Sequence, residues 1–232
     1  MSAIYETSHD PHDLLPVHRH SDAYLTLVVD GAYTEFGPDG PVRCELGTLV
    51  LHPPFHLHGD RFDRHRVRTL NLPLPGLSPS LVMAMRRVAD PRKARALLQR
   101  HPSAWGALWE AADAAVEPRS LSGWQPMFIA RLLAGDADAA AIATDIGISP
   151  EHVSRTLART HGLGPRALRA EWRFRRALVG LAGDGSIASV AMDAGYADQA
   201  HFSRSCRAII GMTPAALRRR IKCVQSMATQ PR

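Results

Sequence analysis

Histidine is concentrated near the start of the chain, where eight of the twelve histidines lie within the first 65 residues. His18 and His20 are two positions apart in the run PVHRHSDAYLTLVVDG, so on a strand both imidazoles project from the same face. Residues 47–60 add His56 and His58. Imidazoles converging inside a fold can bind a transition metal, or they can simply hydrogen-bond within a pocket.

A second set of polar side chains recurs in the C-terminal half. Residues 139–162 and 187–210 each predict a short apolar helix, a turn at a glycine and a second helix. The turn glycines are Gly147 and Gly195, and Ser149 before Pro150 is typical of a helix start. We expect the second helices to present outward the following side chains: Glu151, Ser154, Arg155, Ala158 and Arg159 on the first, and Ala200, His201, Arg204 and Arg207 on the second.

The net charge of +6 is unevenly distributed. Residues 1–120 hold 13 Lys and Arg against 14 Asp and Glu, a balance of −1, whereas residues 121–232 hold 15 against 8, a balance of +7. Phosphate neutralisation by basic side chains supplies much of the affinity for nucleic acid. The charge therefore indicates a polyanion-binding C-terminal module joined to a neutral module with another task.

A helix beginning at Pro165 and covering about residues 166–182 is predicted between the two repeated segments. At about 1.5 Å per residue, 17 residues span about 26 Å, so helices packed at its two ends could lie near the ~34 Å of one DNA turn. This helix carries five arginines: Arg166, Arg169, Arg173, Arg175 and Arg176. We expect Arg169 in particular to contact the DNA backbone.

The ordered motifs of residues 124–220 resemble the DNA-binding domain of AraC-type regulators. The matching positions are Ser149-Pro150, Gly162, Pro165, Arg173, Ala177-Leu178, Ile187, Val190-Ala191, Gly195-Tyr196, Phe202 and Gly211-Met212-Thr213-Pro214. The resemblance implies base-reading positions at Glu151, Ser154 and Arg155 in the first recognition helix, and at Ala200, His201 and Arg204 in the second. The chain departs from the family at Cys206, where a large aromatic residue is usual; we expect Ile209 and Met192 to fill that space, or the space to stay partly empty.

The histidine-bearing stretches resemble the paired motifs of cupins, in which three histidines and a glutamate bind a divalent metal inside a small barrel. This resemblance places His18, His20 and His58 on the histidine-ligand positions and Tyr24 on the glutamate position. A site of this kind could hold zinc, copper, nickel or iron. AraC-type sensor domains often keep the cupin shape without metal. Four further histidines, His9, His12, His52 and His65, are expected at the surface or at strand ends.

The fold class expected is α+β in two domains, a small cupin-like β-barrel with covering helices and an all-α domain of two tandem helix-turn-helix units. Strands are predicted at about residues 24–29, 32–36, 47–51 and 66–72, and helices through residues 77–88 and 105–116. The expected boundaries are 1–75 for the sensor, 76–118 for a helical lid or dimerisation segment, 119–126 for a linker, 127–222 for the DNA-binding domain and 223–232 for a tail.

These features predict a sequence-specific transcription regulator and not an enzyme. Its N-terminal domain would bind a small molecule or metal. Its partners would be double-stranded DNA and a second copy of the chain, bound through the helices near Trp105. If the protein activates transcription, RNA polymerase would be a further partner. One alternative is a metal-dependent cupin enzyme fused to a DNA-binding domain, which Tyr24 in place of the acidic ligand disfavours. Another is a DNA-repair protein, which would need a reactive cysteine in a basic motif that Cys44 lacks. No signal peptide or membrane span is predicted, so a cytoplasmic protein is expected.

Overall fold

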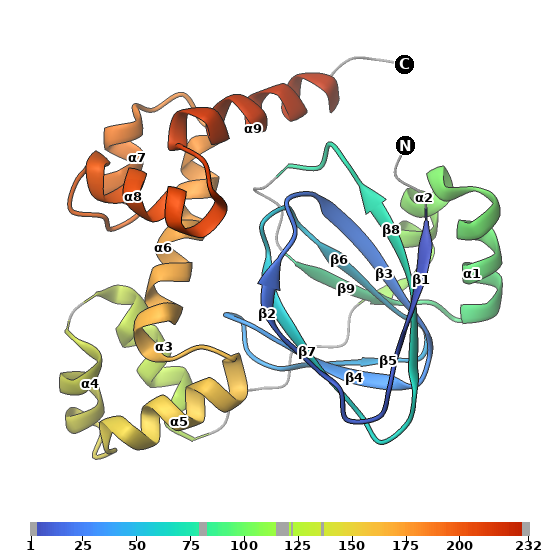
Figure 1. Ribbon diagram of the computed structural model, residues 1–232, viewed down its shortest axis with the longest axis horizontal. Helices are drawn as coiled ribbons and strands as arrows, with labels where there is room; N and C mark the ends of the chain where they lie inside the picture. The colour runs from blue at the N-terminus through green and yellow to red at the C-terminus, as the bar shows by residue number, and fades with distance from the viewer. Residues whose placement is uncertain (1–3, 79–82, 115–120, 122, 136, 229–232) are drawn as a thin grey trace. The chain divides into compact units, whose positions relative to one another are not determined.

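The computed structural model describes residues 4–78, 83–114, 121, 123–135 and 137–228. Contacts between Cα atoms divide the chain into two compact units. The N-terminal unit draws on residues 1–75 and 82–120, and the C-terminal unit on residues 76–81 and 121–232. The first unit is built mainly of strands and the second of helices (Figure 1).

The N-terminal unit consists of two antiparallel sheets. One sheet has the strand order β1-β8-β3-β6-β9-β10 and the other β2-β7-β4-β5. The strands are β1 (Tyr5–His9), β2 (Leu14–Arg19), β3 (Ala23–Asp30), β4 (Ala32–Phe36), β5 (Val42–Glu45), β6 (Thr48–His52), β7 (Leu57–Phe62), β8 (Val67–Leu74), β9 (Ala84–Arg87) and β10 (Asp113–Ala114).

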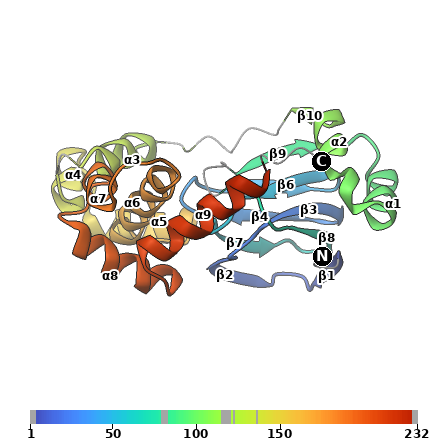
Figure 2. The ribbon, with the colours of Figure 1, turned by 90° about the horizontal axis from the view of Figure 1, so that it is seen from above.

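The two sheets share an apolar core because alternate residues of their strands point between them. The main cluster is formed by Val28, Tyr33, Val42, Cys44, Val50, Phe62, Val67 and Met85, with strands of both sheets contributing. Cys44 is fully buried in it, as expected of a small apolar side chain. Helices α1 (Pro91–Arg100) and α2 (Trp105–Ala111), joined by the 3₁₀ turn η1 (Pro102–Ala104), complete the unit at one end (Figure 2).

The sequence-based expectation of a helix through residues 77–88 is wrong for the residues that the structure describes there. Ala84–Arg87 is strand β9, which pairs with β6 and has Met85 buried. The apolar spacing fits helix or strand over so short a stretch, and pairing with an existing sheet edge decides it. Strands β1, β5 and β7 were also not predicted, whereas the strand expected to carry His18 corresponds to β2, which ends at Arg19, just before His20.

The C-terminal unit contains seven helices among its described residues. They are α3 (Gln125–Ala134), α4 (Ala139–Asp145), α5 (Pro150–His161), α6 (Pro165–Leu181), α7 (Ile187–Asp193), α8 (Gln199–Ile210) and α9 (Pro214–Ala228). Helix α6 contacts α3 and α5 toward one of its ends and α7 and α9 toward the other (Figure 1). Its buried residues include Leu168, Phe174 and Leu181, which lie along the whole helix.

Two expected boundaries differ from the structure. Residues 119, 120 and 122 of the predicted linker 119–126 lie outside the described residues, and its last two positions already belong to α3, with Pro126 in the first turn. The predicted tail begins at residue 223, but α9 continues to Ala228. Among the described residues, no helix combines the length and hydrophobicity needed to cross a membrane.

Candidate nucleic-acid interface and ligand pocket

The two repeated segments fold into matching turns. After α4, the backbone N–H of Gly147 donates to Thr144 and that of Ile148 to Ala143; after α7, Gly195 donates to Met192 and Tyr196 to Ala191. The four N···O distances are 2.9 to 3.0 Å. Both glycines have positive φ, at 72° and 86°, a conformation that other residues adopt at a cost. The sequence repeat is therefore also a structural repeat.

The second helix of each repeat begins and ends in the same way. Ser149 caps α5 and Asp198 caps α8, each accepting from a backbone N–H three residues on. Gly162 and Gly211 end them in the left-handed conformation. Both helices are 12 residues long, so positions from the cap correspond one to one. The connecting turn is one residue longer in the second repeat, because Asp198 rather than Ala197 is the cap.

The outward residues expected to contact DNA lie on accessible helix faces. On α5, Glu151, Ser154, Arg155 and Arg159 are exposed; on α8, Ala200, Arg204 and Arg207 are exposed and His201 is half-buried. Counted from the caps, Arg155 and Arg204 occupy the same position. The opposite faces carry the buried residues, among them Val153 and Leu157 on α5 and Phe202 and Cys206 on α8.

His201 is held against its own turn. Its Nδ1 accepts from the backbone N–H of Ala197 at 3.4 Å, and its ring meets that of Tyr196 edge to face at 5.2 Å. Only the other ring nitrogen is left to face outward. The position is therefore less free to adapt to a base than the arginine three residues further along α8.

Arg169 does not have the expected freedom to contact DNA. Its Nε donates to the backbone oxygen of Leu132 at 3.1 Å, and its Nη2 donates to that of Ala137. These oxygens belong to the end of α3 and to the segment that precedes α4. Arg176 makes a similar bond to Asp193, at the end of α7. Both arginines thus tie α6 to a neighbouring helix, and the sequence alone could not distinguish that role from phosphate binding.

Near Cys206 the structure differs from one sequence-based expectation. The thiol is fully buried, but Met192 is 69% exposed and does not fill space beside it. The rings of Phe202 and Tyr196 lie nearby on this side of α8, with centroids 4.9 Å apart. Burial raises the pKa of Cys206 to about 11.

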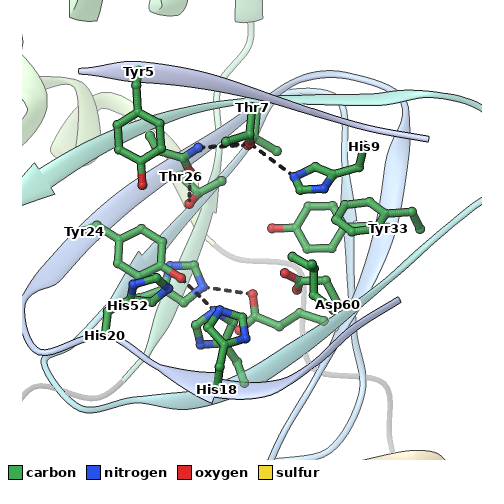
Figure 3. A pocket seen from close by; sticks show the side chains of 16 residues that line it. Tyr5, Thr7, His9, His18, His20, Tyr24, Thr26, Tyr33, His52 and Asp60 are labelled. Atoms are coloured by element: carbon green, nitrogen blue, oxygen red, sulfur yellow. Dashed lines mark hydrogen bonds and ion pairs between the residues drawn. The ribbon is translucent and has the colours of Figure 1, made fainter. Parts of the chain in front are cut away.

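The N-terminal unit brings His18, His20 and His58 together. One possible ligand atom of each lies within 4.8 Å of the others, and this is the one such group of three metal-ligating side chains found among the described residues. His18 and His58 come from paired strands and are register partners, and His20 follows just after β2. All three line a cavity of about 150 Å³ that lies between the two sheets, and Figure 3 shows His18 and His20 on one wall of it.

Tyr24 contacts this cluster directly. Its hydroxyl lies 2.8 Å from Nε2 of His58, and its ring stacks on His52 with a centroid distance of 4.2 Å. Burial lowers the pKa of His58 to about 2, and burial together with nearby His18 and His52 lowers the pKa of His20. Neutral imidazoles are the form that binds metals.

Two further residues of the cavity were missed by sequence reasoning: Glu35 and Asp60. His52, expected at the surface or at a strand end, is the last residue of β6 but is buried, and its Nε2 lies 2.9 Å from Oε2 of Glu35. Burial alone would raise the pKa of Glu35, but His52 and His56 lower it well below its ordinary value. Burial, and then Glu35, raise the pKa of Asp60. The available signal was spacing, since Asp60 is two residues after His58 on one strand.

His9 lies at the end of β1, as expected, and also lines the cavity, with its ring stacked on Phe62 at 4.1 Å. His12 and His65 are exposed, as expected. The opposite wall of the cavity is a network of hydroxyl and amide groups. Thr26 donates to Asn71, whose amide donates to Thr7 and Thr69.

Comparison with known proteins agrees with the geometry of the C-terminal unit. Residues 142–220 match the family model described as a helix-turn-helix domain. The chain is 32% identical over 78 residues to the bifunctional transcriptional activator/DNA repair enzyme Ada of Escherichia coli; the match covers 34% of this chain and 22% of that protein. The chain therefore spans about a fifth of this relative's length.

Solved structures that are similar to this chain include those of the following two proteins. ToxT from Vibrio cholerae is 9% identical, with a TM-score of 0.42, covering 94% of this chain and 99% of that one. A salicylate 1,2-dioxygenase from Pseudaminobacter salicylatoxidans is 27% identical, with a TM-score of 0.28, covering 29% of this chain and 20% of that one.

Two matched turn-and-helix repeats joined by one long helix define a tandem helix-turn-helix DNA-binding domain. The family match covers this domain, which resembles those of AraC-type regulators, and a separate β-rich unit precedes it in the chain.

Proposed function

We propose that the protein is a one-component transcription regulator that reads an asymmetric DNA sequence with α5 and α8 and responds to a ligand in its N-terminal unit. The observation that carries the DNA part is the equivalence of Arg155 and Arg204. Both are exposed and both lie at the same distance from a helix cap; α5 packs on α6, and α8 packs on α7 and α9, which themselves contact α6. An arginine in the major groove pairs with guanine through two hydrogen bonds.

The two recognition helices differ around these arginines. Glu151 and Arg159 of α5 correspond to Ala200 and Ala208 of α8, so one helix presents an acidic and a basic group where the other presents methyl groups. Unlike helices read unlike base pairs. The DNA site of one chain is therefore expected to be two different short sequences about one helical turn apart.

Selection of binding sites from random DNA tests this reading. Replacing Arg155 or Arg204 with Ala should relax base preference in one part of the site only, since a bidentate contact supports about 1–3 kcal/mol of discrimination. Arg219→Ala is the control, because it removes an exposed charge from α9 and not from a recognition helix. A palindromic site for the single chain, or unchanged preference in both arginine variants, would refute the proposal.

The ligand part of the proposal rests on the cavity between the sheets. A concave, enclosed site with convergent polar groups is the usual form of a small-molecule site. We infer that His18, His20 and His58 can hold a transition metal there, as part of a cupin-like sensor. The donor set fits such an ion, since three imidazoles are already gathered and His58 keeps Nδ1 without a hydrogen-bond partner. A bound metal would supply a Lewis-acidic position for a ligand.

Metal analysis of protein purified without a histidine tag tests the metal. About one equivalent per chain is expected, and His20→Ala should lose it. His65→Ala is the matched control, because His65 is exposed and outside the cluster. Metal that stays substoichiometric and unaffected by His20→Ala would leave these histidines as hydrogen-bonding residues of the pocket.

The regulator reading is preferred to a metal-dependent enzyme with a DNA-binding domain because Tyr24 occupies the position of the acidic ligand.

Association of two chains through the α1 and α2 region, contact with RNA polymerase and a cytoplasmic location belong to the same proposal. The apolar groove beside these helices, with Leu97 and Leu108 on its walls, supports the first of them. Sedimentation of the full chain at several concentrations would test it.

A further inference from the structure

The interior of the N-terminal unit holds two carboxyl groups side by side. Glu35 on β4 and Asp60 on β7 are register partners on antiparallel strands, so their side chains leave the sheet on the same face. Both line the cavity. Like-charged groups directly opposite one another destabilise a sheet, and more so when they are taken out of water. Such a pair calls for a compensating group.

The protein compensates only part of this pair. His52 bonds one oxygen of Glu35, whereas the other oxygen, Oε1, is 3.7 Å from Nε2 of His56 and accepts no hydrogen bond. Oδ1 of Asp60 is likewise buried with no hydrogen-bond partner. Each carboxyl group therefore has one buried oxygen that accepts no hydrogen bond, and both residues line the cavity. A buried acceptor left without a donor is costly, so a ligand that donates would relieve both.

The rest of the lining is rich in oxygen and has no fixed positive charge. Among the described residues that line the cavity there is no lysine or arginine. In Figure 3 the oxygens of Tyr5, Tyr24, Thr26 and Asp60 are turned toward a common space. Several hydroxyl oxygens and two carboxyl groups around one space suit a ligand with many N–H donors. Aromatic rings such as those of Tyr24 and Phe62 add to the attraction for a cation.

We propose that this cavity binds a small organic ammonium ion, with Asp60 as its principal counter-ion and Glu35 as a second acceptor. The inference rests on the proposed function, because it assigns the chemistry of the ligand that the N-terminal unit senses. The volume of about 150 Å³ suits a ligand of roughly the size of benzene, since a cavity of ~150 Å³ binds benzene elsewhere. An alkylamine of a few carbon atoms meets both the size and the charge.

The same features disfavour an organic anion. A carboxylate in this cavity would lie beside two carboxyl groups with no lysine or arginine to pair with, and a buried charge without a partner is strongly disfavoured. A metal at His18, His20 and His58 would add positive charge to the same cavity. Ammonium binding should therefore be weaker in zinc-loaded protein than in protein kept in a chelator.

Titration calorimetry of the full chain in a chelator, with butylamine, butanol and butyrate as probes of similar size, tests the inference. We expect butylamine to bind, and butanol and butyrate to bind at least about tenfold more weakly, in line with a charge-assisted hydrogen bond. Equal binding of butanol, preferred binding of butyrate, or binding of none of the three at millimolar concentration would overturn it. Binding that requires zinc would also overturn it and would favour the metal as the effector.

Asp60→Asn supplies the residue-level test. The substitution keeps the shape and removes the charge, and it should weaken butylamine binding about ten- to a hundredfold while leaving any butanol binding unchanged. Asp30→Asn, at an exposed position on β3, is the control for a general charge effect. Undiminished butylamine binding by Asp60→Asn overturns the inference. Specific DNA binding by the wild-type chain is measured in parallel. If the wild-type chain binds no DNA sequence specifically, the proposed regulator is contradicted, whereas the amine results test only the ligand.

Discussion

The hydroxyl of Tyr24 lies 2.8 Å from Nε2 of His58, inside the cluster of three histidines. A tyrosine thus stands next to the candidate metal ligands where the cupin resemblance places a glutamate. A neutral hydroxyl satisfies the imidazole but supplies no negative charge to an ion.

Tyr24→Glu should therefore raise the affinity of the N-terminal unit for zinc, because a carboxylate would join three imidazoles. Tyr24→Phe serves as the control: it removes the hydroxyl without adding a carboxylate and should not raise zinc affinity. Competition with a fluorescent chelator measures both. Equal zinc affinity in wild type and Tyr24→Glu would place the tyrosine outside the coordination sphere.

Glu35→Gln should change how stability depends on pH. Burial alone would raise the pKa of Glu35, but His52 and His56 lower it well below the value of about 4.5 that it has when unfolded. The ionised group therefore contributes stability above about pH 4.5, and that contribution is lost as the pH falls through the folded-state pKa. Wild type should exceed Glu35→Gln in stability near neutrality, with the gap closing in acid. Urea denaturation at a series of pH values measures this, and a constant gap would contradict it.

Arg169→Ala should destabilise the C-terminal unit by about 1–3 kcal/mol, because Leu132 and Ala137 would lose the donor that their backbone oxygens share. The salt dependence of DNA binding should keep its slope. Arg166→Ala is the matched variant: Arg166 is exposed on the first turn of the same helix, and its loss should leave stability unchanged. If Arg166 contacts a phosphate, its loss should reduce the slope of log affinity against log salt by about 0.9.

Cys206→Phe should lower the stability of the C-terminal unit by about 1–3 kcal/mol, since the thiol is fully buried and the rings of Phe202 and Tyr196 already lie close by. A higher melting temperature would instead reveal unfilled space.

In the native protein a maleimide should modify Cys223, which is exposed, and should reach Cys44 and Cys206 only on unfolding.

Sequence reasoning succeeded where local signals agree. In the helix-turn-helix repeats, caps such as Ser149, turn glycines such as Gly195 and the apolar periodicity all specify the same elements. The β unit lacks that agreement. Strand β1, Tyr5–His9, is polar on both faces because its inner face lines a cavity instead of an apolar core, so it shows no alternation. Strand β9 is only four residues long.

The cavity was predicted in part for the same reason. The three histidines could be aligned with a known pattern, whereas Glu35 and Asp60 meet only through the pairing of β4 with β7, which sequence spacing does not contain. Arg169 was misinterpreted because an arginine that bonds backbone oxygens and one that bonds phosphate look alike in sequence. Only the contacts that the arginine makes in the folded structure distinguish these two roles.

Helix α6 sets the phase between the two recognition helices, because α5 and α8 are both held to the rest of the domain through it and its neighbours. Each residue of an α-helix adds a rotation of about 100° and a rise of about 1.5 Å. A single inserted residue in the middle of α6 would thus swing α8 away from the side of the duplex that α5 faces. DNA sites of this protein should accordingly not tolerate the gain or loss of one base pair between their two halves.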